Sequence, residues 1–244
     1  MAQKKVNAVI HSQEKLAEGI YSMWLDAPEM AEAAVPGQFI AVYTNDQSKL
    51  LPRPISICEA DKENGRLRIV YRIAGAGTKE FSECKAGDTL DIMGPLGNGF
   101  PLKKKKAFLI GGGIGIPPML ELAKNLDCEK TAVIGYRDQE TFLADELRKY
   151  ADVVIATEDG SVGTKGNVID AIRAEKLTAD IIYACGPTPM LKALKAYAME
   201  NGIECYISLE EKMACGIGAC LGCVCHSKDI DEHSNVRNKR ICKD

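Results

Sequence analysis

The chain has 244 residues, of which 46% are hydrophobic and 27% charged, a composition typical of folded globular domains rather than of disordered or fibrous chains. The 31 basic and 34 acidic residues give a formal net charge of −3, so charge gives no reason to expect nucleic acid or an anionic membrane as the main partner. The longest apolar stretch, residues 107–120, is interrupted by four glycines and two prolines, which excludes a transmembrane helix there. The N-terminal residues lack the apolar core of an export signal, and we therefore expect a cytoplasmic protein.

The first hundred residues are predicted to form an antiparallel β domain. Short runs rich in β-branched and aromatic residues alternate with turn signals such as Pro36-Gly37 and Asn64-Gly65, a spacing typical of a barrel or sandwich. The expected strands cover residues 20–25, 38–43, 67–73 and 89–93. We therefore expect a β-barrel over residues 1–100.

After residue 100 the pattern changes to strands that alternate with helices. The expected strands cover residues 107–110, 131–136, 152–157 and 181–185, and the expected helices cover 117–125, 141–150, 166–174 and 189–201. This alternation predicts a doubly wound parallel sheet with helices on both faces, here over residues 101–208. Residues 209–244 are rich in glycine and cysteine and too few for a core of their own, so we expect a small domain folded around a metal centre. The predicted fold class is α+β multidomain.

Half of the ten cysteines crowd into the last 30 residues: Cys215, Cys220, Cys223, Cys225 and Cys242. The spacing Cys215-x4-Cys220-x2-Cys223, with Cys242 further on, fits the plant-type pattern for a [2Fe–2S] cluster, which needs four thiolates, two on each iron. Small residues surround these cysteines, and glycine allows the backbone to wrap closely around a cluster. Cys225 is a spare in this interpretation, because the motif is complete without it.

Structural zinc is the alternative for the same segment. Cys220-x2-Cys223 together with Cys225, His226 or Cys242 has the ligand types of a tetrahedral zinc site. The four-residue gap after Cys215 and the glycine density favour iron–sulfur, and both interpretations stay open at this point.

Two turns in the second region are typical of dinucleotide binding. Residues 111–118, GGGIGIPP, follow an expected strand and open an expected helix, the context in which backbone N–H groups and a helix N-terminus meet a pyrophosphate. Gly113 and Gly115 fit the G-x-G-x-x-G fingerprint, although Pro118 replaces its third glycine. The turn Cys185-Gly186-Pro187 also follows a strand, and ligands of open α/β sheets bind at these carboxyl ends. A plain strand-to-helix turn remains the alternative.

The β-rich region carries two further candidate motifs. Arg53-Pro54-Ile55-Ser56 combines a guanidinium fork and a hydroxyl, which suit a diphosphate. Gly75-Ala76-Gly77-Thr78 has backbone and hydroxyl donors for a second oxyanion. Tyr71 precedes this turn, where its phenol ring would cover a flavin or a ribose. Taken singly, Arg53 is better explained as part of a surface ion pair and Tyr71 as a core aromatic residue.

Together these motifs resemble the ferredoxin reductase family, whose members join an FAD-binding barrel carrying R-x-x-S and G-x-G-T/S to a nucleotide domain carrying G-x-G-x-x-P and C-G-P. Here the motifs are residues 53–56, 75–78, 113–118 and 185–187, in the family's order. The tail segment MACGIGACLGCVC, residues 213–225, is similar to that of electron-transfer subunits of NAD-dependent (class 1B) dihydroorotate dehydrogenases. The late C-K-D of those subunits matches residues 242–244. Family members continue for a short tail, whereas this sequence stops two residues after Cys242.

The resemblance implies three groups of cofactor contacts. The FAD diphosphate and flavin edge would be held by Arg53, Pro54, Ile55 and Ser56, the flavin and ribitol lined by Val70, Tyr71 and Arg72, and the remaining phosphate bound by Gly77 and Thr78. NAD(H) would lie against Gly113, Gly115, Cys185, Gly186 and Pro187, with Cys185 near the nicotinamide–flavin junction. The metal ligands would be Cys215, Cys220, Cys223 and Cys242. No residue need act as a general acid or base, because the cofactors supply the chemistry.

The same resemblance implies a function and a partner. A catalytic subunit oxidises dihydroorotate to orotate at FMN, and electrons pass through the [2Fe–2S] cluster to FAD and then as hydride to NAD+, in de novo pyrimidine synthesis. Two catalytic and two electron-transfer subunits would form a heterotetramer, with an apolar docking patch on the barrel and cluster surfaces. The preference for NADH over NADPH follows from the family alone.

Three other functions remain as alternatives. One is the small subunit of an NAD(P)H:ferredoxin or sulfide dehydrogenase, with the same cofactors and another partner. A second is a reductase that serves a soluble oxygenase, although its ferredoxin module is usually longer than the tail available here. The third is a zinc scaffold without enzymatic activity.

Overall fold

The computed structural model describes residues 4–46, 48–231 and 235–244, and the chain divides into two compact units. One unit joins the described residues up to Lys15 with Gly19–Gly99 and Glu211–Asp244; the other comprises Leu16–Glu18 and Phe100–Glu210. The C-terminal cysteine segment thus clusters with the β domain rather than standing alone. Within the described residues, no helix has the length and apolar character needed to cross a membrane.

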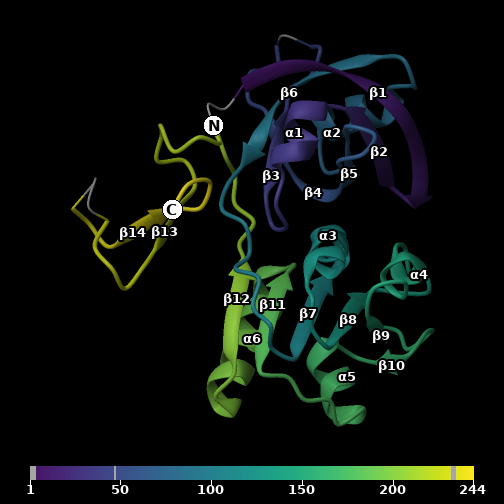
Figure 1. Cartoon of the computed structure of the whole chain (residues 1–244), viewed down its shortest axis with the longest axis vertical. Coiled ribbons are helices and arrows are strands. Elements are labelled where there is room, and N and C mark those ends of the chain that lie inside the picture. The colour runs from purple at the N-terminus through teal and green to yellow at the C-terminus, as the bar shows by residue number, and fades with distance from the viewer. Residues whose placement is uncertain (1–3, 47, 232–234) are drawn as a thin grey trace. The chain divides into compact units, whose positions relative to one another are not determined.

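The first unit is built on a closed antiparallel barrel with strand order β1-β2-β5-β4-β3-β6 (Figure 1). Its strands are β1 (Lys4–Ala17), β2 (Ile20–Asp26), β3 (Phe39–Val42), β4 (Arg53–Asp61), β5 (Arg66–Arg72) and β6 (Thr89–Leu96). Alternate side chains fill the interior, for example Ile57, Leu67 and Ile69, which are almost fully buried. Helix α1 (Pro28–Ala33) adds Met30 and Ala31 to this core. The predicted antiparallel barrel is confirmed.

Helix α2 (Ala76–Glu83) follows β5 directly and carries the predicted Gly-Thr motif into its first turn. Phe81 on this helix is fully buried and meets Tyr71 of β5 edge to face, with ring centroids 6.0 Å apart. Burial of this aromatic pair fixes the start of α2 beside the end of β5.

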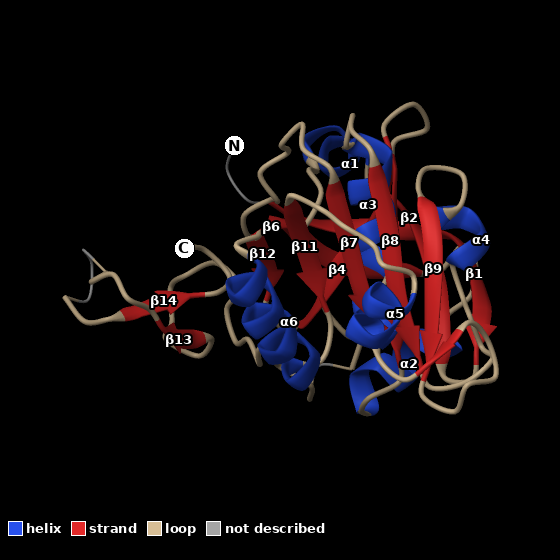
Figure 2. Cartoon of the chain, turned by 90° about the horizontal axis from the view of Figure 1, so that it is seen from below, coloured by secondary structure: helices blue, strands red, loops and turns tan. Residues whose placement is uncertain are grey.

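The second unit contains a six-stranded sheet of order β10-β9-β8-β7-β11-β12, in which every strand pairs in parallel with its neighbours. The strands are β7 (Ala107–Gly112), β8 (Lys130–Tyr136), β9 (Asp152–Thr157), β10 (Thr164–Lys165), β11 (Ile181–Cys185) and β12 (Glu204–Ser208). Buried side chains of α5 (Val168–Ala174) and α6 (Thr188–Asn201) cover one face, and α3 (Pro117–Asn125) lies behind the sheet (Figure 2). The predicted parallel sheet covered on both faces is confirmed.

The C-terminal segment forms a small module against the barrel. It contains the two-stranded sheet of β13 (Val224–His226) and β14 (Asn238–Arg240). The Asn98 side-chain amide, just after β6, donates to the Lys243 carbonyl at 3.0 Å. A Cβ placed on Gly216 would lie 3.4 Å from Leu96 Cδ1 and 3.9 Å from Phe39 Cε2, so the cysteine loop touches the barrel at β3 and β6.

Several expected elements differ from those observed. The helix expected over residues 141–150 is limited to α4 (Ala144–Leu147), because Leu143 adopts the left-handed conformation, φ 66°, just before it. The sequence patterns did not single out β1, β4 or β12 as strands. β4 begins with Arg53-Pro54, and proline inside a run argues against a strand unless it lies near the strand's first residue, as it does here.

Candidate cofactor sites

The two motifs predicted to bind FAD lie against each other at one end of the barrel. Arg53 begins β4, and its Nη1 donates to the Leu51 carbonyl at 2.6 Å. The rest of its guanidinium covers Gly77, since a Cβ added there would overlap Nε and lie 2.7 Å from Nη2. A positive charge is thus held beside the first turn of α2, where N–H groups lack intrahelical partners. This pairing of a cation with a helix N-terminus suits a phosphate.

The hydroxyl of Thr78 shapes the turn that leads into α2. Its Oγ1 accepts from the Ala74 and Gly75 N–H groups, at 2.9 and 3.2 Å, and donates to the Gly75 carbonyl at 3.1 Å. The side chain is largely buried. Thr78 therefore fixes the local backbone, and the donor it offers a phosphate is its backbone N–H.

Tyr71 packs as a core residue rather than facing a ligand with its ring. It is 1% exposed, stacks on Tyr21 with centroids 5.9 Å apart and donates through its hydroxyl to Gln13 Oε1 at 2.9 Å. Burial raises the pKa of this phenol above its usual range. Because side chains alternate along a strand, Val70 and Arg72 lie on the opposite face of β5. This packing matches the core-aromatic alternative for the Tyr71 ring and leaves only its backbone to contact a ligand.

Phe39 connects the predicted FAD motif to the cysteine loop. It is the register partner of Ser56 in β4 and of Leu96 in β6, and paired Cα atoms of antiparallel strands are about 5 Å apart. Its ring also faces Gly216. Sequence analysis did not single out Phe39, and the only available signal was its position in an expected strand.

The two turns predicted to bind the dinucleotide meet in the second unit. A Cβ placed on Gly115 would overlap the Cys185 carbonyl and lie 2.6 Å from the Gly186 nitrogen, so only glycine permits this approach. Gly186, with φ +152°, also lies close to the backbone of Gly112. The turns follow β7 and β11, which are neighbours in the sheet although β8, β9 and β10 intervene in sequence. This is a topological switch point, where open α/β sheets bind ligands.

The Cys185 thiol lies inside this turn and stays neutral. The residue is fully buried, and burial, helped by the Glu210 charge and opposed by a hydrogen bond with Ser208, raises the pKa of its thiol to about 12. Cys185 therefore contributes shape and backbone groups to the turn rather than a thiolate.

Two contacts join the four predicted ligand cysteines, one between two sulfurs and one from a backbone N–H to a sulfur. The Sγ atoms of Cys223 and Cys242 are 3.4 Å apart, and metal–thiolate bonds of about 2.3 Å would place two tetrahedral ligands roughly 3.8 Å apart. Cys220 donates its backbone N–H to Cys215 Sγ at 3.3 Å. Among the described residues, no three or more His, Cys, Asp or Glu side chains are arranged to hold one metal ion. The paired arrangement fits a two-iron centre, which takes two thiolates on each iron.

Backbone donors point at these sulfurs. Burial raises the pKa of the Cys215 thiol, but the N–H groups of Ile217, Cys220 and Ala219, together with the Cys220 thiol, outweigh burial and bring the pKa down to about 7. The Gly218 N–H donates to Cys242 Sγ at 3.1 Å. These donors favour the thiolate, the form that binds metal, at Cys215, whereas burial and the neighbouring Cys223 thiol raise the pKa of the Cys242 thiol to about 12. Cys225 stands apart on β13, opposite Lys239.

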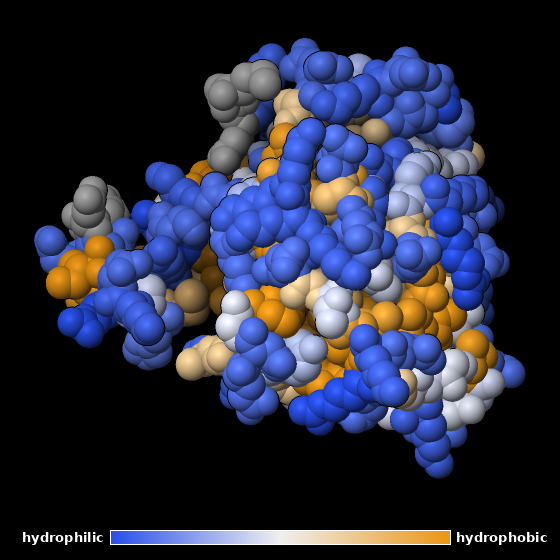
Figure 3. Space-filling model, turned by 60° about the horizontal axis from the view of Figure 1, so that its bottom comes forward, coloured by the Kyte–Doolittle hydropathy of each residue, from blue (hydrophilic) through white to orange (hydrophobic). Residues whose placement is uncertain are grey.

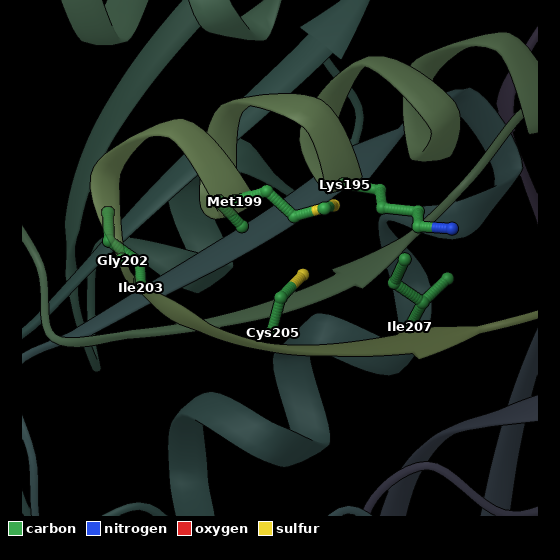
Figure 4. A pocket seen from close by; sticks show the side chains of 7 residues that line it. Lys195, Met199, Gly202, Ile203, Cys205 and Ile207 are labelled. Carbon is green, nitrogen blue, oxygen red and sulfur yellow. The ribbon is translucent and has the colours of Figure 1, made fainter.

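An apolar groove of about 450 Å³ lies between α6 and β12. Figure 4 shows Lys195 and Met199 of the helix and Cys205 and Ile207 of the strand around it. The residues that line the groove include none of the predicted site residues, so it is separate from the three cofactor sites described above.

Two family models match the chain. Residues 7–100 match the oxidoreductase FAD-binding domain, and residues 210–244 match the iron–sulfur cluster binding domain of dihydroorotate dehydrogenase B. With the parallel sheet between them, these domains define a flavin-dependent oxidoreductase component of the ferredoxin reductase fold with an appended iron–sulfur domain.

Similar proteins narrow this class. A "Dihydroorotate dehydrogenase B (NAD(+)), electron transfer subunit" from Streptococcus mutans is 44% identical over 98% of this chain and 94% of the relative, and one from a Geobacillus species is 42% identical over 100% and 95%. A solved structure of an NADH-dependent reduced ferredoxin-NADP oxidoreductase superposes with a TM-score of 0.87 at 30% identity, covering 97% of this chain and 86% of that one. The chain belongs to the family of electron-transfer subunits of dihydroorotate dehydrogenase B, which confirms the resemblance.

Proposed function

We propose that this chain passes electrons between the FMN of a dihydroorotate-oxidising catalytic subunit and NAD+, through a [2Fe–2S] cluster and FAD, in de novo pyrimidine (UMP) synthesis. A flavin exchanges electrons singly or as a hydride, whereas an iron–sulfur cluster takes them one at a time, so FAD belongs between the cluster and NAD+. The protein's task is to hold these groups in that order.

The observation that carries the proposal is the position of Phe39. This residue pairs with Ser56 of the predicted FAD motif on one strand and faces Gly216 of the cysteine loop with its ring. A single residue thus links the two predicted cofactor sites within one compact unit. Electron transfer between two centres requires this kind of proximity.

The barrel residues would hold FAD chiefly by its phosphates. Arg53 offers a fork of N–H donors to one phosphate, and the backbone N–H groups of Gly77 and Thr78 offer donors to the other. Pro54, Ile55 and Ser56 continue along β4 as half-buried residues, and we assign them to the flavin edge. Val70, the Tyr71 backbone and Arg72 would line the flavin and ribitol.

The tail and the second unit would hold the other two groups. Cys215 with Cys220 would bind one iron, and Cys223 with Cys242 the other. The backbone N–H of Cys220 donating to the Cys215 sulfur, and the 3.4 Å between the Cys223 and Cys242 sulfurs, support this assignment. NAD(H) would lie across the switch point, against Gly113 and Gly115 of one turn and residues 185–187 of the other. The preference for NADH over NADPH is inferred from the relatives' name.

The partner would be an FMN-containing catalytic subunit, two copies of each chain forming the assembly, in the cytoplasm. The name "electron transfer subunit" implies such a partner for the relatives. The C-terminal module exposes Leu221, Ile230 and Val236, and hydrophobic residues are visible on its surface in Figure 3. Exposed apolar groups of this kind are typical of docking surfaces.

The test is cofactor analysis of the purified chain followed by reconstitution. We expect FAD, iron and acid-labile sulfide in a ratio of one to two to two, and dihydroorotate-dependent NAD+ reduction once an FMN-containing dihydroorotate-oxidising subunit is added. A colourless protein that holds zinc but no sulfide would contradict the proposal.

A second function has one observation in its favour. The similarity to the NADH-dependent reduced ferredoxin-NADP oxidoreductase structure spans 97% of this chain, and it supports an NAD(P)H:ferredoxin or sulfide dehydrogenase-type small subunit with the same cofactors. The two functions differ in the protein that copurifies with the chain. Reduction of NAD+ by reduced ferredoxin, without activity on dihydroorotate, would establish the second.

A further inference from the structure

One arginine ties the last turn of the chain to the cysteine loop. Arg240, at the end of β14, donates through Nε and Nη2 to the two carboxylate oxygens of Asp244, at 2.9 Å each. Its Nη1 donates to the Gly218 carbonyl at 3.0 Å. The Gly218 N–H in turn donates to Cys242 Sγ at 3.1 Å. The guanidinium therefore contacts residue 218, which carries the N–H donor, and residue 244, which follows the acceptor Cys242 by two positions.

Several contacts fix the position of the Arg240 side chain. The residue is 8% exposed, and its own backbone N–H donates to the Asp244 carboxylate at 2.8 Å. Asp231 contributes a second carboxylate at 3.9 Å. A bidentate arginine–carboxylate pair fixes orientation as well as distance, so Arg240 has one position available for its third contact, the Gly218 carbonyl.

The glycine that receives this contact is also restrained from its other side. Gly218 has φ +79°, and a Cβ there would clash with the Lys243 side chain. Lys243 is itself anchored to the barrel, because its carbonyl accepts the hydrogen bond from Asn98. The orientation of the Gly218 N–H thus depends on a short connected set of contacts, with Arg240 at its centre.

We propose that Arg240 is a positioning residue for the iron–sulfur centre: it holds the Gly218 N–H on the Cys242 sulfur and thereby raises the reduction potential of the centre. Reduction adds negative charge to the cluster and its thiolates. A fixed N–H donor stabilises that charge, and hydrogen bonds to the sulfurs are among the factors that set the potential. This inference rests on the proposed function, since it requires a cluster at Cys242.

The test compares Arg240→Lys and Asp244→Asn with Lys239→Gln in the full-length, cofactor-loaded chain. The midpoint potential is measured by a redox titration followed by electron paramagnetic resonance. We expect Arg240→Lys and Asp244→Asn each to lower the equilibrium constant for cluster reduction about three- to tenfold, a shift of roughly 30–60 mV to more negative potential. Lys239→Gln removes a neighbouring half-exposed charge outside the contact set and should leave the potential unchanged.

Arg240→Lys, which keeps the charge, and Asp244→Asn, which removes one, together distinguish positioning from simple electrostatics. If Arg240 acted only through its charge, Arg240→Lys would leave the potential unchanged and Asp244→Asn, which removes a negative charge, would raise it. Either result would overturn the proposal. If a variant loses its cluster during purification, hydrogen–deuterium exchange over residues 214–222 replaces the titration, with the variant and Lys239→Gln both measured in the iron-free form. Faster exchange than in Lys239→Gln, with FAD retained, supports positioning, and equal exchange refutes it. Absence of iron and sulfide from the unaltered chain would instead refute the proposed function.

Discussion

Because Gly77 has no side chain, the guanidinium of Arg53 can lie directly against it. A Cβ there would overlap Arg53 Nε, so Gly77→Ala should displace the guanidinium from the start of α2. Hydrogen bonds to charged groups contribute about 1.5–3 kcal/mol, and we expect FAD affinity to fall at least about tenfold. The measurement is the FAD-to-protein ratio after purification, followed by titration of the apoprotein with FAD.

Gly75→Ala is the matched control for this prediction. Gly75 lies in the same turn, but its φ of −176° is ordinary extended backbone and a Cβ there meets nothing within 4 Å. It should retain FAD. Arg53→Ala should match Gly77→Ala, because both remove the same contact. Normal FAD content in Gly77→Ala, with loss in Arg53→Ala, would show that Gly77 does not position the arginine.

Gly115 has a corresponding role in the second unit. Because a Cβ there would overlap the Cys185 carbonyl, Gly115→Ala should force the two turns apart. We expect the KM for NADH in flavin reduction to rise about tenfold or more, while FAD content stays unchanged. Gly202→Asn is the control: Gly202 ends α6 with φ +65° and open space around it, a conformation that asparagine tolerates. An unchanged KM in Gly115→Ala would remove these turns from the NAD(H) site.

At the scale of residues, the sequence predicted where the turns lie better than it predicted which contacts each side chain makes. The glycine patterns indicated both turns, but close approaches such as Gly77 to Arg53 depend on strand pairing that spacing does not specify. Tyr71 shows the limit most clearly. Its neighbours suggested a ligand contact, whereas the alternation of β5 turns its ring into the core. Arg240 is separated from Cys242 by one residue, yet its role depends on the loop at Gly218.

At the scale of elements, the start of α2 is held by one hydroxyl. Thr78 Oγ1 joins three backbone groups of the preceding turn, and loss of a helix-start hydrogen bond costs about 1 kcal/mol. Thr78→Val, which keeps the shape of the side chain, should lower the melting temperature by a few degrees and weaken FAD binding several-fold. Thr78→Ser should restore both. Equal FAD binding in the valine and serine variants would show that this turn does not position the phosphate donors.

The bounds of helices and strands were predicted best where the hydrophobic pattern is strongly periodic. The helix expected over residues 117–125 and the strands expected over 152–157 and 181–185 coincide with α3, β9 and β11. Elements with a less regular pattern were not predicted. β4 carries a proline, α2 begins with a glycine-containing turn, and β12 becomes a strand through its parallel pairing with β11. In each of these, tertiary contacts decide the structure over local preference.

At the scale of the whole molecule, the structure groups the barrel and the tail in one compact unit and the parallel sheet in another. The boundaries predicted at residues 100 and 208 remain predictions. Sequence patterns did not indicate that the tail joins the barrel, because that association depends on single contacts, such as Asn98 to Lys243, between segments far apart in the chain. It is this association that brings the cysteine loop to the strand beside the predicted FAD motif.

The proposed electron path should be open to interruption at the cluster without loss of the reaction between NADH and FAD. Cys220→Ser removes one thiolate of the Cys215 pair, so cluster-dependent reduction of NAD+ with dihydroorotate and the catalytic subunit should fall to background. NADH should still bleach the bound FAD, because the barrel and the second unit are unaltered. Cys225→Ser is the control, since Cys225 lies on β13 outside the two sulfur pairs, and both reactions should persist. If Cys220→Ser kept full activity with the catalytic subunit, electrons would reach FAD by a route that does not pass through these cysteines.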